Sequence, residues 1–88
     1  MPATAPDDWR LVEAAATGIS GAAYFGDEPY ARQRHDELLG AARRLAPLGL
    51  DLVALTRHAD GLLSACLRRD VEKARRSAGD IIRLLSFL

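Results

Sequence analysis

The sequence predicts an all-α protein, a small antiparallel four-helix bundle that self-associates or forms part of a complex. Apolar residues recur at alternating steps of three and four in four successive segments of the 88-residue chain. Such steps place side chains on one face of a helix. Four apolar faces in so short a chain must cover one another, which produces a bundle. The length allows one helical-bundle domain over 7–88, preceded by an N-terminal tail over 1–6.

The first half of the chain is expected to form two helices. Asp7 or Asp8 can cap the first helix, which runs to about Tyr24 and is stopped by Gly26. The second helix has Pro29 in its first turn and runs to about Leu45. Pro47 ends it, because proline disfavours helical geometry at the preceding residue. The two apolar stripes are Trp9, Val12, Ala16, Ile19 and Ala23, then Ala31, His35, Leu38, Ala42 and Leu45.

The second half is expected to form the other two helices. Gly49 and Asp51 open the third helix, which reaches about Arg69, and Asp70 caps the fourth. The third stripe is Leu48, Leu52, Leu55, Ala59, Leu62 and Cys66, and the fourth is Val71, Ala74, Ala78, Ile81, Leu85 and Leu88. Connections this short make consecutive helices antiparallel.

Composition indicates the compartment. A single cysteine cannot form an internal disulfide and fits a reducing cytoplasm. Residues 1–7 lack the basic and apolar regions of a signal peptide, and no apolar run approaches the roughly 20 residues of a membrane span. We therefore expect a cytoplasmic protein. Abundant alanine, with arginine as eleven of the twelve basic residues, is typical of a bacterial genome rich in G and C.

The first helix carries more apolar surface than its core stripe explains. No charged residue occurs from Ala14 to Gly26, whereas a surface helix is polar on its outer side. Glycine inside a helix is less favourable than alanine by about 1 kcal/mol, but it lets a second surface approach closely. We expect contact with a second copy or a partner here; the alternative is that this helix is the most central of the four. The expected contact residues are Leu11, Ala14, Gly18, Gly21, Ala22 and Phe25.

The C-terminal end is also more apolar than one stripe requires. Leu84, Phe87 and Leu88 either fold into the bundle or join an intermolecular surface, because exposed apolar patches mark interaction sites.

Basic residues concentrate around the third connection and the fourth helix. The expected basic patch contains Arg68, Arg69, Lys73 and Arg76. Residues 1–37 carry seven acidic and three basic residues, a charge of −4, and residues 38–88 carry five and nine, a charge of +4. The acidic half of one copy can face the basic half of another. The net charge of zero argues against a nucleic-acid partner.

Two histidines give an alternative function. His35 lies on the second apolar stripe, and His58 lies beside the third. A four-helix bundle with a histidine on a helix is similar to bacterial histidine-phosphotransfer domains, which implies a signalling module using His35 or His58. In that family a lysine and then a glycine usually follow the histidine. Here Asp36-Glu37-Leu38-Leu39-Gly40 follows His35, and Ala59-Asp60-Gly61 follows His58, without the lysine.

A third function is a small-molecule binder inside the bundle, with Tyr24, Phe25 and Tyr30 as the aromatic cluster. No spacing in the sequence assembles a nucleophile, base and orienting group, or a metal-ligand set, so we expect no enzyme, cofactor or metal. The sequence therefore favours a non-catalytic protein-interaction module, an adaptor, regulator or accessory subunit that forms a homo-oligomer or binds another protein.

Overall fold

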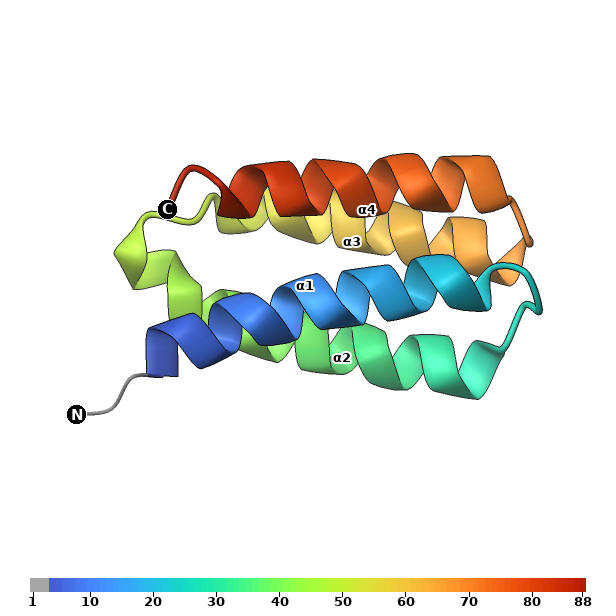
Figure 1. Cartoon of the computed structure of the whole chain (residues 1–88), viewed down its shortest axis with the longest axis horizontal. Coiled ribbons are helices and arrows are strands. Elements are labelled where there is room, and N and C mark those ends of the chain that lie inside the picture. The colour runs from blue at the N-terminus through green and yellow to red at the C-terminus, as the bar shows by residue number, and fades with distance from the viewer. Residues whose placement is uncertain (1–3) are drawn as a thin grey trace.

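Four helices run alternately up and down in the computed structural model, which describes residues 4–88 (Figure 1). They are α1 (Thr4–Ala22), α2 (Glu28–Leu45), α3 (Leu52–Leu67) and α4 (Val71–Leu85), with a 3₁₀ turn, η1 (Ala46–Leu48), between α2 and α3. The described chain contains no strand, so the predicted all-α class is confirmed.

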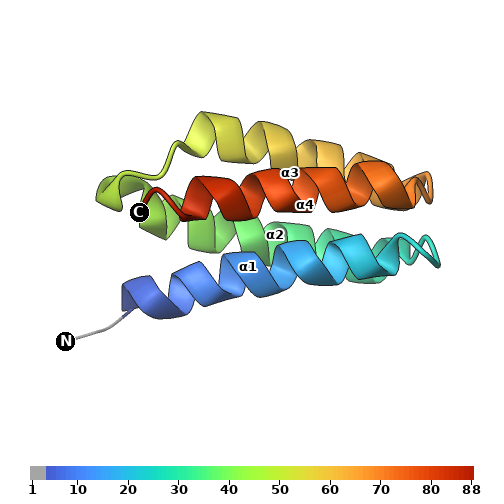
Figure 2. The same cartoon turned by 45° about the horizontal axis from the view of Figure 1, so that its top comes forward.

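The helices form two hairpins, α1–α2 and α3–α4, lying side by side along a molecule 39 Å long (Figures 1 and 2). Each helix packs against its neighbour in sequence, α1 also packs against α4, and α1 reaches α3 across the bundle. The α1–α2 and α3–α4 turns meet at one end, and η1 meets the C-terminus at the other. We call these the turn end and the C-terminal end.

The core is built from the predicted stripes. The large side chains removed from solvent are Val12, Ile19, Leu38, Leu45, Leu55, Leu62, Cys66, Ile81 and Leu85, with alanines packed between them. Leu48 and Leu88, at the ends of the third and fourth stripes, are exposed instead. The reason is that Leu48 lies in η1, before α3 begins, and Leu88 lies beyond the end of α4.

Aspartates begin three of the helices. Asp27, Asp51 and Asp70 are the N-caps of α2, α3 and α4, and each side chain accepts a hydrogen bond from the backbone N–H three residues later. Such a bond satisfies an amide that has no partner within the helix. The sequence predicts the cap at Asp70 and places Asp51 with Gly49 at the opening of the third helix.

The start of α1 differs from the prediction. The helix begins at Thr4, so residues 4–6, which the sequence places in a tail, are helical, and residues 1–3 lie outside the described residues. Pro6 is compatible with this, because the first turn needs no amide hydrogen there. Asp8 is therefore inside the helix instead of at its cap. Its buried carboxylate accepts a 2.9 Å hydrogen bond from Arg44 Nε and links α1 to α2.

Candidate protein-interaction surfaces

The expected contact surface of α1 is divided by the packing of α2. Leu11, Gly18 and Ala22 are half-buried, and Gly18 faces Tyr30 of α2. Ala14 and Gly21 lie on the outer side and are exposed. Phe25, just after the helix, is 81% exposed. The outer part of the predicted surface therefore remains available, while the inner part belongs to the α1–α2 contact.

The two helical glycines of α1 have different environments. A Cβ atom on Gly18 would lie 2.5 Å from the Tyr30 hydroxyl oxygen, so the missing side chain lets α2 approach α1. A Cβ atom on Gly21 would have no neighbour within 4 Å. Packing within the chain thus explains why position 18 is a glycine, but it gives no reason for a glycine at position 21.

A shallow depression lies beside Phe25. It has a volume of about 250 Å³ and is lined by Gly18, Gly21, Ala22, Phe25, Asp27 and Tyr30. The small residues of α1 form its floor, and the two aromatic side chains stand beside them. It is open to solvent, so it offers a place for a protruding side chain of a partner more readily than an enclosed site for a small molecule.

Arg69 holds the two connections of the turn end together. Its guanidinium donates a 3.0 Å hydrogen bond from Nη2 to the Tyr24 carbonyl oxygen. A Cβ atom on Gly26 would lie 3.0 Å from Arg69 Cγ, and Gly26 has a φ of +64°. Gly26 thus combines a left-handed backbone with a close approach, two requirements that only glycine meets without strain.

Arg69 itself adopts a left-handed conformation, with a φ of 59°. Its N–H bonds to the Cys66 carbonyl, and the N–H of Asp70 bonds to the Ala65 carbonyl at 2.8 Å. This pair of bonds closes the end of α3 in the arrangement that glycine usually provides. The hydrogen bond to Tyr24 gives a reason for arginine at this position.

The predicted basic patch adjoins this aromatic region through Arg69. Arg68, Lys73 and Arg76 are exposed, and among the residues from Asp7 onward none of them has a carboxylate oxygen within 4 Å. Arg44, near the opposite end of the bundle, is instead paired with Asp8. The turn end therefore combines exposed aromatic side chains with positive charge.

The apolar C-terminus forms a separate surface. Phe87 is 80% exposed, Leu88 is also exposed, and Leu84 is half-buried against the core. Leu88 lies next to the η1 turn, since a Cβ atom on Gly49 would be 3.8 Å from Leu88 Cδ2. Figure 1 places this end of the chain opposite the turn that carries Phe25. The two apolar surfaces predicted from the sequence are thus at opposite ends.

Each histidine lies beside an aspartate of the next helix. His35 Nε2 is 2.9 Å from Asp60 Oδ1, which requires a proton on that nitrogen, and the His35 side chain is only 12% exposed. His58 Nδ1 is 3.7 Å from Asp80 Oδ2, and Asp80 also bonds to Arg83. Sequence reasoning misses the partner of His35, because the two residues are 25 positions apart. A half-buried nitrogen facing a carboxylate does not resemble an accessible phosphoryl acceptor.

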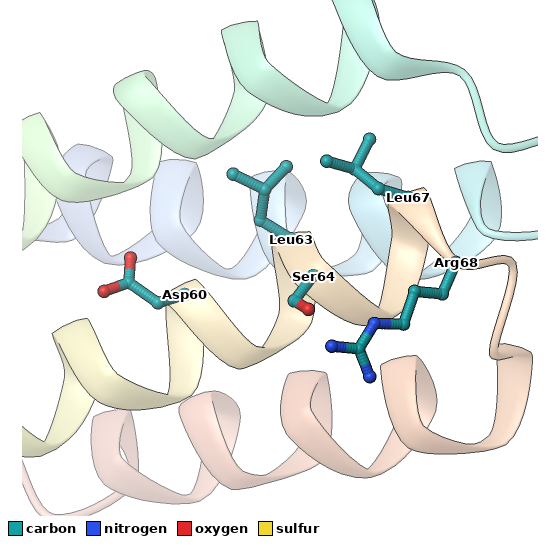
Figure 3. A pocket seen from close by; sticks show the side chains of 5 residues that line it. All are labelled: Asp60, Leu63, Ser64, Leu67 and Arg68. Carbon is teal, nitrogen blue, oxygen red and sulfur yellow. The ribbon is translucent and has the colours of Figure 1, made fainter.

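A second depression lies on the outer side of α3, where the sequence gives no signal. Its volume is about 460 Å³, and it is lined by Asp60, Leu63, Ser64, Leu67 and Arg68. Figure 3 shows Leu63 and Leu67 pointing toward α2, with Asp60 and Arg68 at the two ends of the row.

The remaining titratable and ligand-type groups supply little chemistry. Cys66 is buried, and this burial, followed by the nearby Asp27 carboxylate, raises the pKa of its thiol. A protonated, buried thiol is a poor nucleophile. Within the described part of the chain, no three His, Cys, Asp or Glu side chains lie together as a metal site would need. None of the described helices has the length and apolar character to cross a membrane.

Comparisons of the chain with protein-family models, with curated proteins and with solved structures give no match.

Proposed function

We propose that this chain is a non-catalytic helical interaction module, an adaptor, regulator or accessory subunit, that binds a protein partner at its turn end. The observation that carries the proposal is the exposure of Phe25 beside the depression over Gly21. An aromatic side chain left in water contributes little to the fold, whereas its burial by a partner is favourable by roughly 1.5–3 kcal/mol. Aromatic residues of this kind dominate the binding energy of interfaces.

The surroundings of Phe25 indicate the character of the partner. Arg69 and the exposed cations near it, Arg68 and Lys73, place positive charge next to the apolar surface. A partner that presents an apolar side chain bordered by acidic residues complements both features. Surface charges of this kind favour the correct orientation and fast association more than high affinity.

The C-terminal end is the second contact surface of this proposal. Phe87 and Leu88 are exposed there, whereas at the turn end a depression and exposed cations accompany Phe25. We therefore assign the principal contact to the turn end and an accessory contact to the C-terminal end.

Site-specific photocrosslinking tests the principal contact. Benzoylphenylalanine is placed at position 25, and a matched control carries it at position 36, where the side chain is also exposed, at 87%. In the native cell, we expect a crosslinked protein at position 25 and none at position 36. Gly21→Trp, at a position where a Cβ atom has no neighbour within 4 Å, places a bulky ring in the depression and should remove the crosslink. Equal crosslinking at both positions, or no crosslink at position 25, contradicts the proposal.

A further inference from the structure

On the outer side of α3, an acidic and a basic residue each lie four positions from the same small residue. Asp60, Ser64 and Arg68 follow one another in steps of four, so they lie along one face of the helix and its C-terminal cap. Figure 3 shows the order directly, with Asp60 and Arg68 on either side of Ser64. Leu63 and Leu67 run beside this row and are only half-buried.

Both charged residues can form further ion pairs or hydrogen bonds. Arg68 is exposed and has no carboxylate oxygen within 4 Å among the residues from Asp7 onward. The Asp60 side chain is 64% exposed, and its Oδ1 contacts His35, while its Oδ2 makes no hydrogen bond or ion pair with those residues. The contact with His35 holds the Asp60 carboxylate at the edge of the depression, with one oxygen toward solvent.

We propose that a second copy of this chain docks on this surface, with the two α3 helices antiparallel and crossing at Ser64. A two-fold axis through Ser64 places Asp60 of each copy opposite Arg68 of the other. Each charged residue then lies about 6 Å along the helix from the axis. The two ion pairs form together, as an interface between identical surfaces requires. The small side chain of Ser64 permits close approach, and Leu63 and Leu67 of both copies become covered.

The charge pattern favours a second copy over an unrelated helix of one charge. A partner carrying only acidic groups would meet Arg68 favourably but would be repelled by Asp60, and a basic partner would have the reverse difficulty. The same surface in antiparallel orientation satisfies both residues. The formal net charge of the chain is zero, so two copies do not repel each other as a whole.

The dimer is expected to be weak and sensitive to salt. Exposed ion pairs contribute little to the stability of a complex and are screened by added ions. The half-buried leucines supply the apolar contribution. Arg68 is shared with the cations of the turn end, but Asp60, Ser64 and the two leucines are not. The dimer is tested at Asp60 and Arg68 and the proposed function by crosslinking at Phe25, so the two can fail independently.

Charge reversal tests the geometry in sedimentation experiments over a range of protein concentrations. Asp60→Arg and Arg68→Asp each create two pairs of like charge, and we expect either to weaken dimerisation by roughly tenfold or more. The double variant Asp60→Arg/Arg68→Asp restores opposite charges in both pairs and should dimerise nearly as well as the natural chain. Controls are Asp36→Arg and Arg75→Asp, which make the same charge changes elsewhere and should leave the dimer intact.

Asp60→Arg also removes the contact with His35, so circular dichroism must show that each variant is folded. Arg68→Asp does not alter that contact and tests the dimer independently. Recovery in the double variant cannot result from misfolding. The inference is overturned if the natural chain stays monomeric at every soluble concentration, if single reversals leave the dimer unchanged, or if the double reversal fails to restore it.

Discussion

At the scale of single residues, the two glycines near the end of α1 show how one residue type serves two purposes. Gly18 makes room for Tyr30 of α2, and the Tyr30 ring in turn lies 5.6 Å below the Arg34 guanidinium. A Cβ atom on Gly21, in contrast, would meet no other side chain or neighbouring helix within 4 Å. Glycine is a poorer helix former than alanine, and no close contact within the monomer offsets this loss of stability at position 21. A contact with a partner at this position agrees with that observation.

Alanine substitutions distinguish these two roles. Gly21→Ala should increase the free energy of unfolding by roughly 0.5–1 kcal/mol, because alanine is the better helix former and has space for its methyl group. Gly18→Ala should increase the free energy of unfolding by a smaller amount, because its methyl group displaces the Tyr30 ring. Urea denaturation measures both.

The control for this comparison is the same pair of substitutions in a Tyr30→Ala background. Without the ring, the two alanines should stabilise the chain by similar amounts, since the coupling between positions 18 and 30 is lost. An equal gain at both positions in the natural background would contradict the role assigned to Gly18.

At the scale of helices, polar side chains determine which faces of neighbouring helices meet. Asp8 and Arg44 join α1 to α2, His35 and Asp60 join α2 to α3, and His58 and Asp80 bring α3 and α4 together. Of the carboxylates in these contacts, only that of Asp8 is nearly removed from solvent. A buried carboxylate without a partner is strongly unfavourable, so the contact with Arg44 is the most consequential of these for stability.

Two neighbouring arginines allow a matched test of this contact. Arg44→Ala should lower the free energy of unfolding by about 1–2 kcal/mol, because it leaves the Asp8 carboxylate without its hydrogen bond. Arg43→Ala removes the same charge from an exposed position with no carboxylate oxygen within 4 Å among the residues from Asp7 onward, and should change this free energy by no more than about 0.5 kcal/mol. Thermal or urea unfolding of the two variants gives the comparison, and equal effects would show that the ion pair contributes nothing.

The four helices and their buried faces could be predicted from the sequence, whereas the contacts between particular residues of neighbouring helices could not. The spacing of residues such as Ile19, Leu38 and Leu62 depends only on the helical repeat, and all three are buried. The pairing of His35 with Asp60 depends on the rotation and register of α2 against α3, which periodicity does not fix. Likewise the sequence identifies Phe25 and Phe87 as excess apolar residues but does not indicate that they lie at opposite ends.

At the scale of the whole molecule, charge and apolar surface are distributed over separate regions. The turn end carries aromatic side chains and cations, the C-terminal end carries exposed leucines and Phe87, and the outer side of α3 carries balanced charges. One chain can therefore contact a partner at an end while a second copy lies on its side. In the interior, Cys66 is the one ionisable group of the apolar cluster in the described chain.

Because Cys66 is buried, the stability of the whole bundle is expected to fall as the pH becomes alkaline. Because burial and then Asp27 raise the pKa of the thiol in the folded chain above its ordinary value near 9.0, the unfolded chain loses this proton first as the pH rises. Titration of the thiol therefore contributes nothing to the free energy of unfolding at neutral pH. Above the ordinary pKa it lowers this free energy, by at most about 1.4 kcal/mol per pH unit.

Urea denaturation from neutral to alkaline pH, carried out on the natural chain and on Cys66→Ala, separates the contribution of the thiol from that of the tyrosines and lysine that both chains share. Cys66→Ala should be less stable at pH 7 because of the cavity it creates, and its stability should fall less steeply at high pH. Parallel curves for the two chains would mean that the thiol titrates alike in the folded and unfolded states.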